Sequence, residues 1–128
     1  MTPEILVLTL GALLTIFQIV LMAIPANMQL GPRYTMGPRD KPAELHGKAG
    51  RLHRAMGNMF EAMVLYIAAA VAVTYAGGTA FTAACAWVWL AARVLYIPLY
   101  AYGISPWRSY VWAVGLLANA LMLIAALL

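Results

Sequence analysis

Charged residues and cysteine are both scarce in this chain of 128 residues. Only 9% of the residues are charged and 65% are hydrophobic, whereas soluble domains carry about 25% charged residues. This composition excludes an ordinary soluble domain and predicts a polytopic membrane protein. The single cysteine, Cys85, excludes an intrachain disulfide and a multi-cysteine metal site. His46 and His53 have no partners at metal-ligand spacing, so we expect no bound metal.

The positive charge of the chain lies in short segments between apolar runs. The net charge is +4, and most of the basic residues fall between residues 33 and 54. This distribution is typical of the loops of a membrane protein and not of a nucleic-acid-binding surface. We therefore expect no nucleic-acid partner.

Four long apolar runs predict four membrane-spanning helices. The first, residues 5–24, is a run of 20 residues without a charge, about the length needed to cross a hydrocarbon core. Residues 76–79 predict a tight turn, and the Gly and Pro of residues 103–106 end the third helix. The predicted fold is all-α, a single integral membrane four-helix bundle with antiparallel, up-down topology over residues 1–128. Its spans are about 4–26, 48–75, 80–102 and 106–128, with one long loop at about 29–47.

The basic residues also predict an orientation. The loop at 29–47 and the third junction, which holds Arg108, carry basic residues, whereas the 76–79 turn carries none. By the positive-inside rule both termini are periplasmic or luminal, and the long loop is cytoplasmic. We expect a bacterial inner membrane, with the site described next toward the cytoplasm.

Two polar stripes are the candidate site. On the second helix Arg51, Arg54, Asn58 and Glu61 fall within roughly 80° of one another at about 100° per residue. The third helix repeats the pattern with polar and aromatic residues at spacings of four, three and four. Because these two helices are antiparallel, both stripes lie at the same membrane depth. The stripe of the third helix consists of Trp89, Arg93, Tyr96 and Tyr100.

Such a pocket suits a small zwitterionic or anionic ligand. Arginine binds carboxylates through two hydrogen bonds, and Glu61 can take an ammonium group. Asn58 can pair with an amide, and the tyrosines offer hydroxyls and ring faces. A peptide with two carboxylates and one amine would use every group.

Structural readings of the same residues stay open. Arg51 and Arg54 can extend toward lipid headgroups, and Tyr96 and Tyr100 can belong to an interfacial aromatic belt. Glu61 lies deeper in the span, where a carboxylate needs a partner. An ion pair between Glu61 and Arg93 would satisfy both charges without any ligand.

The two motifs together resemble the MAPEG family, the membrane-associated proteins in eicosanoid and glutathione metabolism. Their patterns here are R-x-x-R-A-x-x-N-x-x-E at 51–61 and A-R-x-x-Y-x-x-x-Y at 92–100. The resemblance implies a four-helix membrane homotrimer that binds glutathione near the cytosolic face, between neighbouring subunits. It also implies glutathione contacts from Arg51, Arg54, Asn58, Glu61, Tyr96 and Tyr100, to which the stripe of the third helix adds Arg93.

The resemblance further implies a residue that stabilises the glutathione thiolate just after the tyrosines of the third span. Arg108 is the nearest candidate, one residue later than in the leukotriene C4 synthase type, and Ser105 is the second. Arg33 is a further possible contact from the loop. Met56 and Ala62 depart from the family, because some members place polar glutathione contacts there.

The resulting hypothesis is a glutathione-dependent membrane transferase or peroxidase. The thiolate is the nucleophilic form of a thiol, and a nearby cation favours it. Glutathione would be a co-substrate, without a metal, and the bilayer would supply a lipophilic electrophile or lipid hydroperoxide. The alternatives are a non-catalytic member of the same fold that binds a lipid or a partner protein, and a structural membrane bundle.

Overall fold

The computed structural model describes all of residues 1–128 and contains helices only. The helices are α1 (Pro3–Leu30), α2 (Pro32–Thr35), α3 (Gly47–Ala76), α4 (Ala80–Ala101) and α5 (Trp107–Leu127). All except the short α2 are long and apolar enough to cross a membrane. The all-α, four-span architecture expected from the sequence is thereby confirmed.

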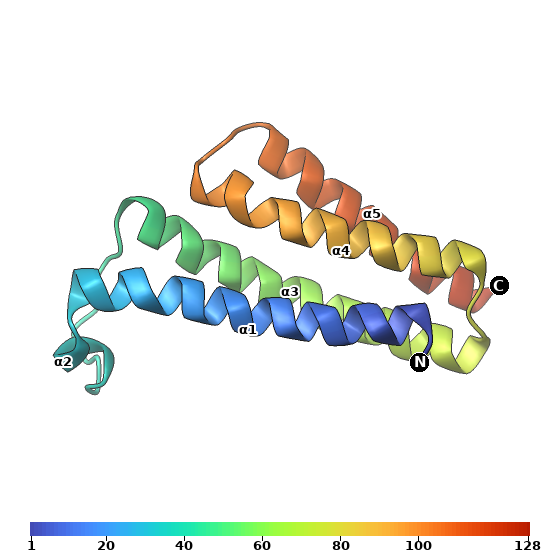
Figure 1. Cartoon of the computed structure of the whole chain (residues 1–128), viewed down its shortest axis with the longest axis horizontal. Helices are drawn as coiled ribbons and strands as arrows, with labels where there is room; N and C mark the ends of the chain where they lie inside the picture. The colour runs from blue at the N-terminus through green and yellow to red at the C-terminus, as the bar shows by residue number, and fades with distance from the viewer.

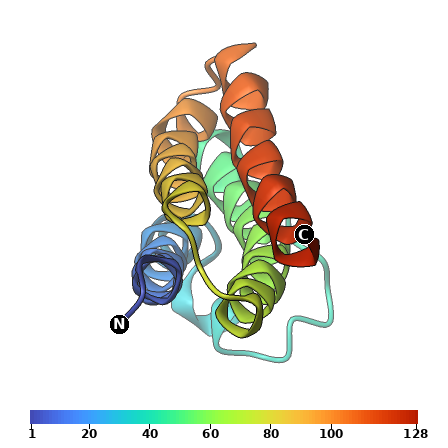
Figure 2. The same cartoon turned by 90° about the vertical axis from the view of Figure 1, so that its right-hand side faces the viewer.

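The four long helices form an up-down bundle with two different ends (Figure 1). Both chain termini and the α3–α4 turn lie at one end, which we call the hairpin end. The α4–α5 connection and the segment containing α2 lie at the other, which we call the loop end. Each long helix contacts every other except for the pair α1 and α5, and the end-on view in Figure 2 shows these two on different sides of α3 and α4.

Local sequence explains where the helices begin and end. The Thr2 side chain accepts a hydrogen bond from the Ile5 N–H, and Thr79 and Thr82 form a capping box at the start of α4. Gly31 ends α1 with φ at 84°, a conformation that glycine adopts without strain. Helix α1 continues past Pro25 to Leu30, four residues beyond the predicted end of the span, although an internal proline removes one backbone donor. Helix α2, inside the long loop, has no apolar periodicity and was not predicted.

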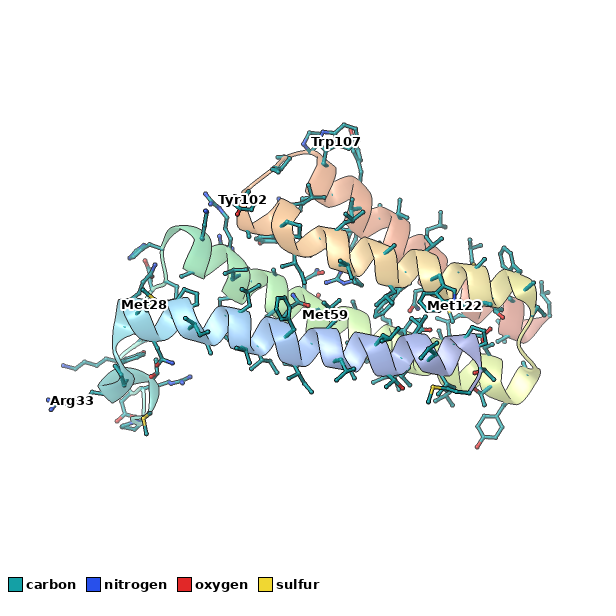
Figure 3. The ribbon with its side chains drawn as sticks, in the orientation of Figure 1. Met28, Arg33, Met59, Tyr102, Trp107 and Met122 are labelled. Atoms are coloured by element: carbon teal, nitrogen blue, oxygen red, sulfur yellow. The ribbon has the colours of Figure 1, made fainter.

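The core is built from a few large side chains among many small ones. The rings of Tyr66 and Trp89 stack with centroids 4.2 Å apart, and both residues are fully buried. Met59 lies in the same core, near the middle of the bundle in Figure 3. Alanines at 69, 70 and 86 let the helix backbones approach closely, as is usual in membrane bundles.

A buried carboxylate at the hairpin end was not predicted. Glu4 is 2% exposed, and its Oε1 accepts a 2.5 Å hydrogen bond from the Thr82 hydroxyl. The Tyr66 hydroxyl donates to the Glu4 backbone carbonyl across 2.8 Å. A Cβ at Gly78 would lie 3.0 Å from Glu4 Oε1, so the turn packs directly on the carboxylate. These contacts join α1, α3 and α4 at the end of the bundle opposite the candidate site.

Candidate functional site

The two polar stripes meet in the bundle, as the sequence predicts. Arg93 of α4 donates a 2.9 Å hydrogen bond from Nη1 to Asn58 Oδ1 of α3. Its Nε donates to Met59 Sδ at 3.3 Å, and its Nη2 has no hydrogen-bond partner. Arg93 is 3% exposed, so this cation is held inside the bundle. Asn58, and not Glu61, therefore accepts the hydrogen bond of this cation. The Arg93–Glu61 ion pair left open by the sequence is not formed.

Tyr96 and Tyr100 continue the α4 stripe toward the loop end. Their ring centroids are 5.4 Å apart in an edge-to-face arrangement, and the Arg93 guanidinium lies 4.6 Å from the Tyr96 ring. The Tyr100 hydroxyl accepts a 3.3 Å hydrogen bond from Arg54 Nε of α3. On the other side, the Arg108 guanidinium of α5 lies 4.7 Å from the Tyr100 ring centroid. Tyr100 is thus in contact with cations from two different helices.

Two neighbouring cavities open between α3, α4 and α5. The larger, about 280 Å³ and here called the Tyr100 cavity, is lined by Asn58, Tyr96, Tyr100, Arg108, Ser109 and Trp112. The smaller, about 80 Å³ and here called the Glu61 cavity, holds Glu61, Arg93 and Asn119 among mostly apolar residues. Both are lined by Asn58 and Trp112, so the two cavities adjoin.

The two cavities are lined by more basic than acidic residues. Arg108 and Arg93 are the cations, and Glu61 is the only acidic residue that lines either cavity. Glu61 itself is exposed on the surface of the single chain, so its carboxylate is free to receive a cationic group from outside. The pair of cavities can therefore take an anionic group beside Arg108 and an ammonium group beside Glu61.

Some predicted residues lie outside these cavities. Arg51 is half-buried and donates from Nη1 to the carbonyl of Ala101 at 3.3 Å, where a cation also suits the C-terminal dipole of α4. Arg54 reaches the site only through Tyr100. Ser105 is exposed in the α4–α5 connection and lines neither cavity. Arg33 extends away from the bundle at the loop end (Figure 3).

Sequence reasoning predicted Arg108 of α5 but missed three other residues of this helix that line the cavities. Ser109 and Trp112 line the Tyr100 cavity, and Asn119 lines the Glu61 cavity. A signal was present, because Arg108 and Trp112 are four residues apart and share one face of a helix. Asn119 Nδ2 donates to the Leu65 carbonyl of α3 at 3.3 Å, which leaves Asn119 Oδ1 buried without a partner.

The fold and the cavities define a class of protein: a four-span integral membrane protein with a cationic, tyrosine-lined pocket near one end. Comparison with known families matches residues 7–128 to the MAPEG family. The match covers nearly the whole chain, so this chain belongs to the MAPEG family, as its two motifs predicted. No curated protein and no solved structure matches it.

Proposed function

We propose that this protein is a glutathione-dependent membrane transferase or peroxidase that acts on lipophilic substrates. The observation that supports this most is the Tyr100 cavity, where Arg108 and two tyrosines adjoin the carboxylate of Glu61 through Asn58. Membership of the MAPEG family supports the same proposal, because the family includes glutathione transferases and peroxidases.

Glutathione carries two carboxylates, one ammonium and two amide bonds, and the site offers a partner for each kind of group. Asn58 Oδ1 is engaged by Arg93, so its Nδ2 is left to donate to a peptide carbonyl. Glu61 would receive the ammonium group, and Arg93, whose Nη2 has no hydrogen-bond partner, lines the same cavity. Arg54 has only its Nε engaged, so its two Nη groups can bind a carboxylate.

Arg108 is the proposed thiolate-stabilising residue. A free thiol has a pKa near 8.5, and a cation within a few ångströms lowers that pKa because it favours the charged form. In conjugation, the thiolate sulfur would form a bond to an electrophilic carbon while the leaving group departs with the bonding electrons. In peroxide reduction, the sulfur would take the distal hydroperoxide oxygen, the lipid alcohol would leave after protonation, and a second glutathione would then yield the disulfide and water.

The lipophilic substrate would reach the site from the bilayer. Trp112 lines both cavities and is also 43% exposed, so in a bilayer one side chain would face both the pocket and the lipid. Leu116, one helical turn further along α5, lines the Glu61 cavity and is exposed as well. An apolar molecule in the membrane could therefore approach the sulfur without crossing water.

We further propose a homotrimer in which glutathione lies between neighbouring subunits. The exposure of both Arg54 and Glu61 in the single chain supports this, because charged groups beside lipid are costly and a second subunit would cover them. Mass measurement of the protein in detergent or nanodiscs tests the assembly. Three chains per particle would agree with the proposal, and a monomer that still binds glutathione would contradict the shared site.

Activity assays test the proposed function directly. The detergent-solubilised protein is given glutathione with either an aryl halide electrophile or a lipid hydroperoxide, and conjugate or lipid alcohol is measured. We expect turnover with at least one of the two substrates. Glutathione binding without turnover on any electrophile or hydroperoxide would favour the non-catalytic alternative, in which the same pocket serves lipid or partner binding.

A further inference from the structure

A third cavity lies under the long loop, apart from the candidate site. Its volume is about 520 Å³, and its walls come from the last turns of α1, the segment around α2 and the first turns of α3. None of its lining residues lines the Tyr100 or Glu61 cavity. We call it the loop cavity, and Arg54 is the one lining residue that also takes part in the proposed glutathione site.

Hydrogen bonds fix the loop that borders the loop cavity. The Gln29 side chain bonds both backbone groups of His46, donating to its carbonyl at 2.9 Å and accepting from its N–H at 3.0 Å. Across the loop, the Tyr34 hydroxyl donates to the Lys41 carbonyl at 2.6 Å. These bonds tie the end of α1 to the start of α3, so the cavity belongs to the folded loop.

The lining of the loop cavity combines apolar residues of α1 with cations from the loop and from α3. Met22, Ala23 and Ala26 of α1 form part of the apolar wall. Arg39 and Arg54 supply two cations, while Glu44 is the only acidic residue in the lining. Two arginines against one glutamate leave one net positive charge among these three groups.

Both arginines have donors that no other protein group uses, and those of Arg54 are shared with the proposed glutathione site. Arg39 Nε and Nη2 donate to the Thr35 carbonyl at 3.0 and 2.6 Å, which fixes the guanidinium and leaves Nη1 without a protein partner. Arg54 is held through its Nε, which donates to Tyr100. Two guanidinium groups fixed in this way are suited to binding a phosphate or a carboxylate.

We infer that the loop cavity binds the acidic head group of an amphiphile whose acyl chain lies along the apolar wall of α1. The cavity sits where α1 ends, which is also where a membrane-spanning helix leaves the hydrocarbon region. Basic pockets between membrane helices at the membrane surface are known to select acidic lipid head groups. The head group can be the phosphate of a membrane phospholipid or the carboxylate of a free fatty acid.

Thermal unfolding of the detergent-purified full chain tests the inference with three ligands. Dioleoyl phosphatidylglycerol presents a phosphodiester with a net negative charge, dioleoyl phosphatidylcholine has the same chains without net charge, and oleate presents a carboxylate. A ligand that binds only the folded state raises the unfolding midpoint. We expect a shift with phosphatidylglycerol, with oleate or with both, and no matching shift with phosphatidylcholine.

Matched arginine variants identify the cavity. Arg39 has φ at 56°, a region that asparagine tolerates, so Arg39→Asn removes the charge without adding backbone strain. Arg33→Asn is the control, because Arg33 carries the same charge in the same loop but points away from the bundle (Figure 3). We expect Arg39→Asn to lower the affinity for the acidic ligand about tenfold, as for the loss of one charge-assisted contact. Arg33→Asn should bind the acidic ligand with an affinity near that of the wild type. Glu44→Gln should strengthen binding, because it removes the only acidic residue of the lining.

Three outcomes would overturn the inference: no shift with either acidic ligand, an equal shift with phosphatidylcholine, or equal losses in Arg39→Asn and Arg33→Asn. Equal losses would mean that the charge of the whole loop attracts the ligand. Since Arg39 lies outside the Tyr100 and Glu61 cavities, the glutathione titration of Arg39→Asn should match the wild type. The failure of this inference is therefore distinguishable from a failure of the proposed glutathione site.

Discussion

Arg93 donates from Nη1 to the Asn58 side-chain oxygen across 2.9 Å, and this bond joins the polar stripes of α3 and α4 inside the bundle. It positions Asn58 at the boundary of the two cavities, because Asn58 lines both. The carboxylate of Glu61 is left unpaired beside them. A buried arginine that takes a neutral amide as its partner leaves the only carboxylate of the site available to a ligand.

We expect the contributions of Arg93 and Asn58 to the free energy of unfolding to be coupled. Asn58→Leu would leave the buried guanidinium with a second unpartnered nitrogen, and we expect a loss of about 1–3 kcal/mol in the free energy of unfolding. Adding Arg93→Met removes the stranded charge, so the double variant should recover much of that loss. Unfolding of the two single variants and the double variant in the same detergent measures the coupling. Strictly additive losses would show that the two residues act independently.

Glu61→Gln should weaken glutathione binding while the protein stays folded. The Glu61 side chain is exposed in the chain and has no hydrogen bond to lose, whereas the proposed ammonium contact needs its charge. The loss of a charge-assisted contact predicts about tenfold weaker affinity. Calorimetric titration gives the affinity, and the unfolding midpoint without ligand gives the stability. A lowered midpoint with unchanged glutathione affinity would assign Glu61 a structural role.

The Arg108→Ala variant should still bind glutathione but should no longer stabilise its thiolate. Without the guanidinium, the pKa of the bound thiol should rise by about one unit or more, so conjugation at neutral pH falls and recovers as the pH is raised. The pH profile of conjugation and the ultraviolet absorbance of the thiolate measure this shift. The control variant is Lys41→Ala, which also removes one positive charge. Lys41 is exposed in the loop and lines none of the three cavities.

An unchanged pH profile in Arg108→Ala would move the thiolate-stabilising role to another residue. The hydroxyls of Ser105 and Ser109 are then compared through their alanine variants. Ser109 lines the Tyr100 cavity and Ser105 does not, so we expect the larger loss of activity from Ser109→Ala.

Tyr66→Phe tests the separation of the two ends of the bundle. It removes the 2.8 Å hydrogen bond to the Glu4 carbonyl, and we expect a loss of about 1 kcal/mol in the free energy of unfolding. The stacked contact with Trp89 remains, because phenylalanine keeps the ring. Glutathione affinity should not change, since this bond lies at the hairpin end. A large change in affinity would show that the hairpin end controls the site.

The parts of the site that helical periodicity determines were predictable. Asn58 and Glu61 share one face of α3, and Arg93, Tyr96 and Tyr100 share one face of α4, so antiparallel packing brings the two faces together. The contacts of side chains near the helix ends could not be predicted in the same way. Arg51 belongs to the α3 stripe, but the end of α4 lies close enough for its guanidinium to bond the Ala101 carbonyl.

The features that depend on tertiary contacts could not be predicted. Whether Ser105 or Ser109 lines the cavity depends on how the α4–α5 connection sets the rotation of α5 about its axis. The connection has no sequence periodicity from which that rotation could be predicted. Glu4 begins an apolar helix, where an acidic residue ordinarily faces the surface, and its burial depends on the packing of Thr82 and the Gly78 turn against its carboxylate. The loop cavity likewise depends on the hydrogen bonds between Gln29 and His46, which are 17 residues apart.

The most direct test of the central claim is a glutathione titration that follows the unfolding midpoint of the detergent-solubilised protein. Ophthalmic acid, the analogue without a thiol, is the parallel ligand. A ligand that binds only the folded state adds about 2.7 kcal/mol at a hundredfold excess over its dissociation constant, so binding should be visible as a rise in the midpoint. We predict that both ligands raise it in the wild type and that both effects shrink in Glu61→Gln. The absence of a shift with either ligand at millimolar concentrations would contradict the glutathione site and leave membership of the MAPEG family as a statement about the fold.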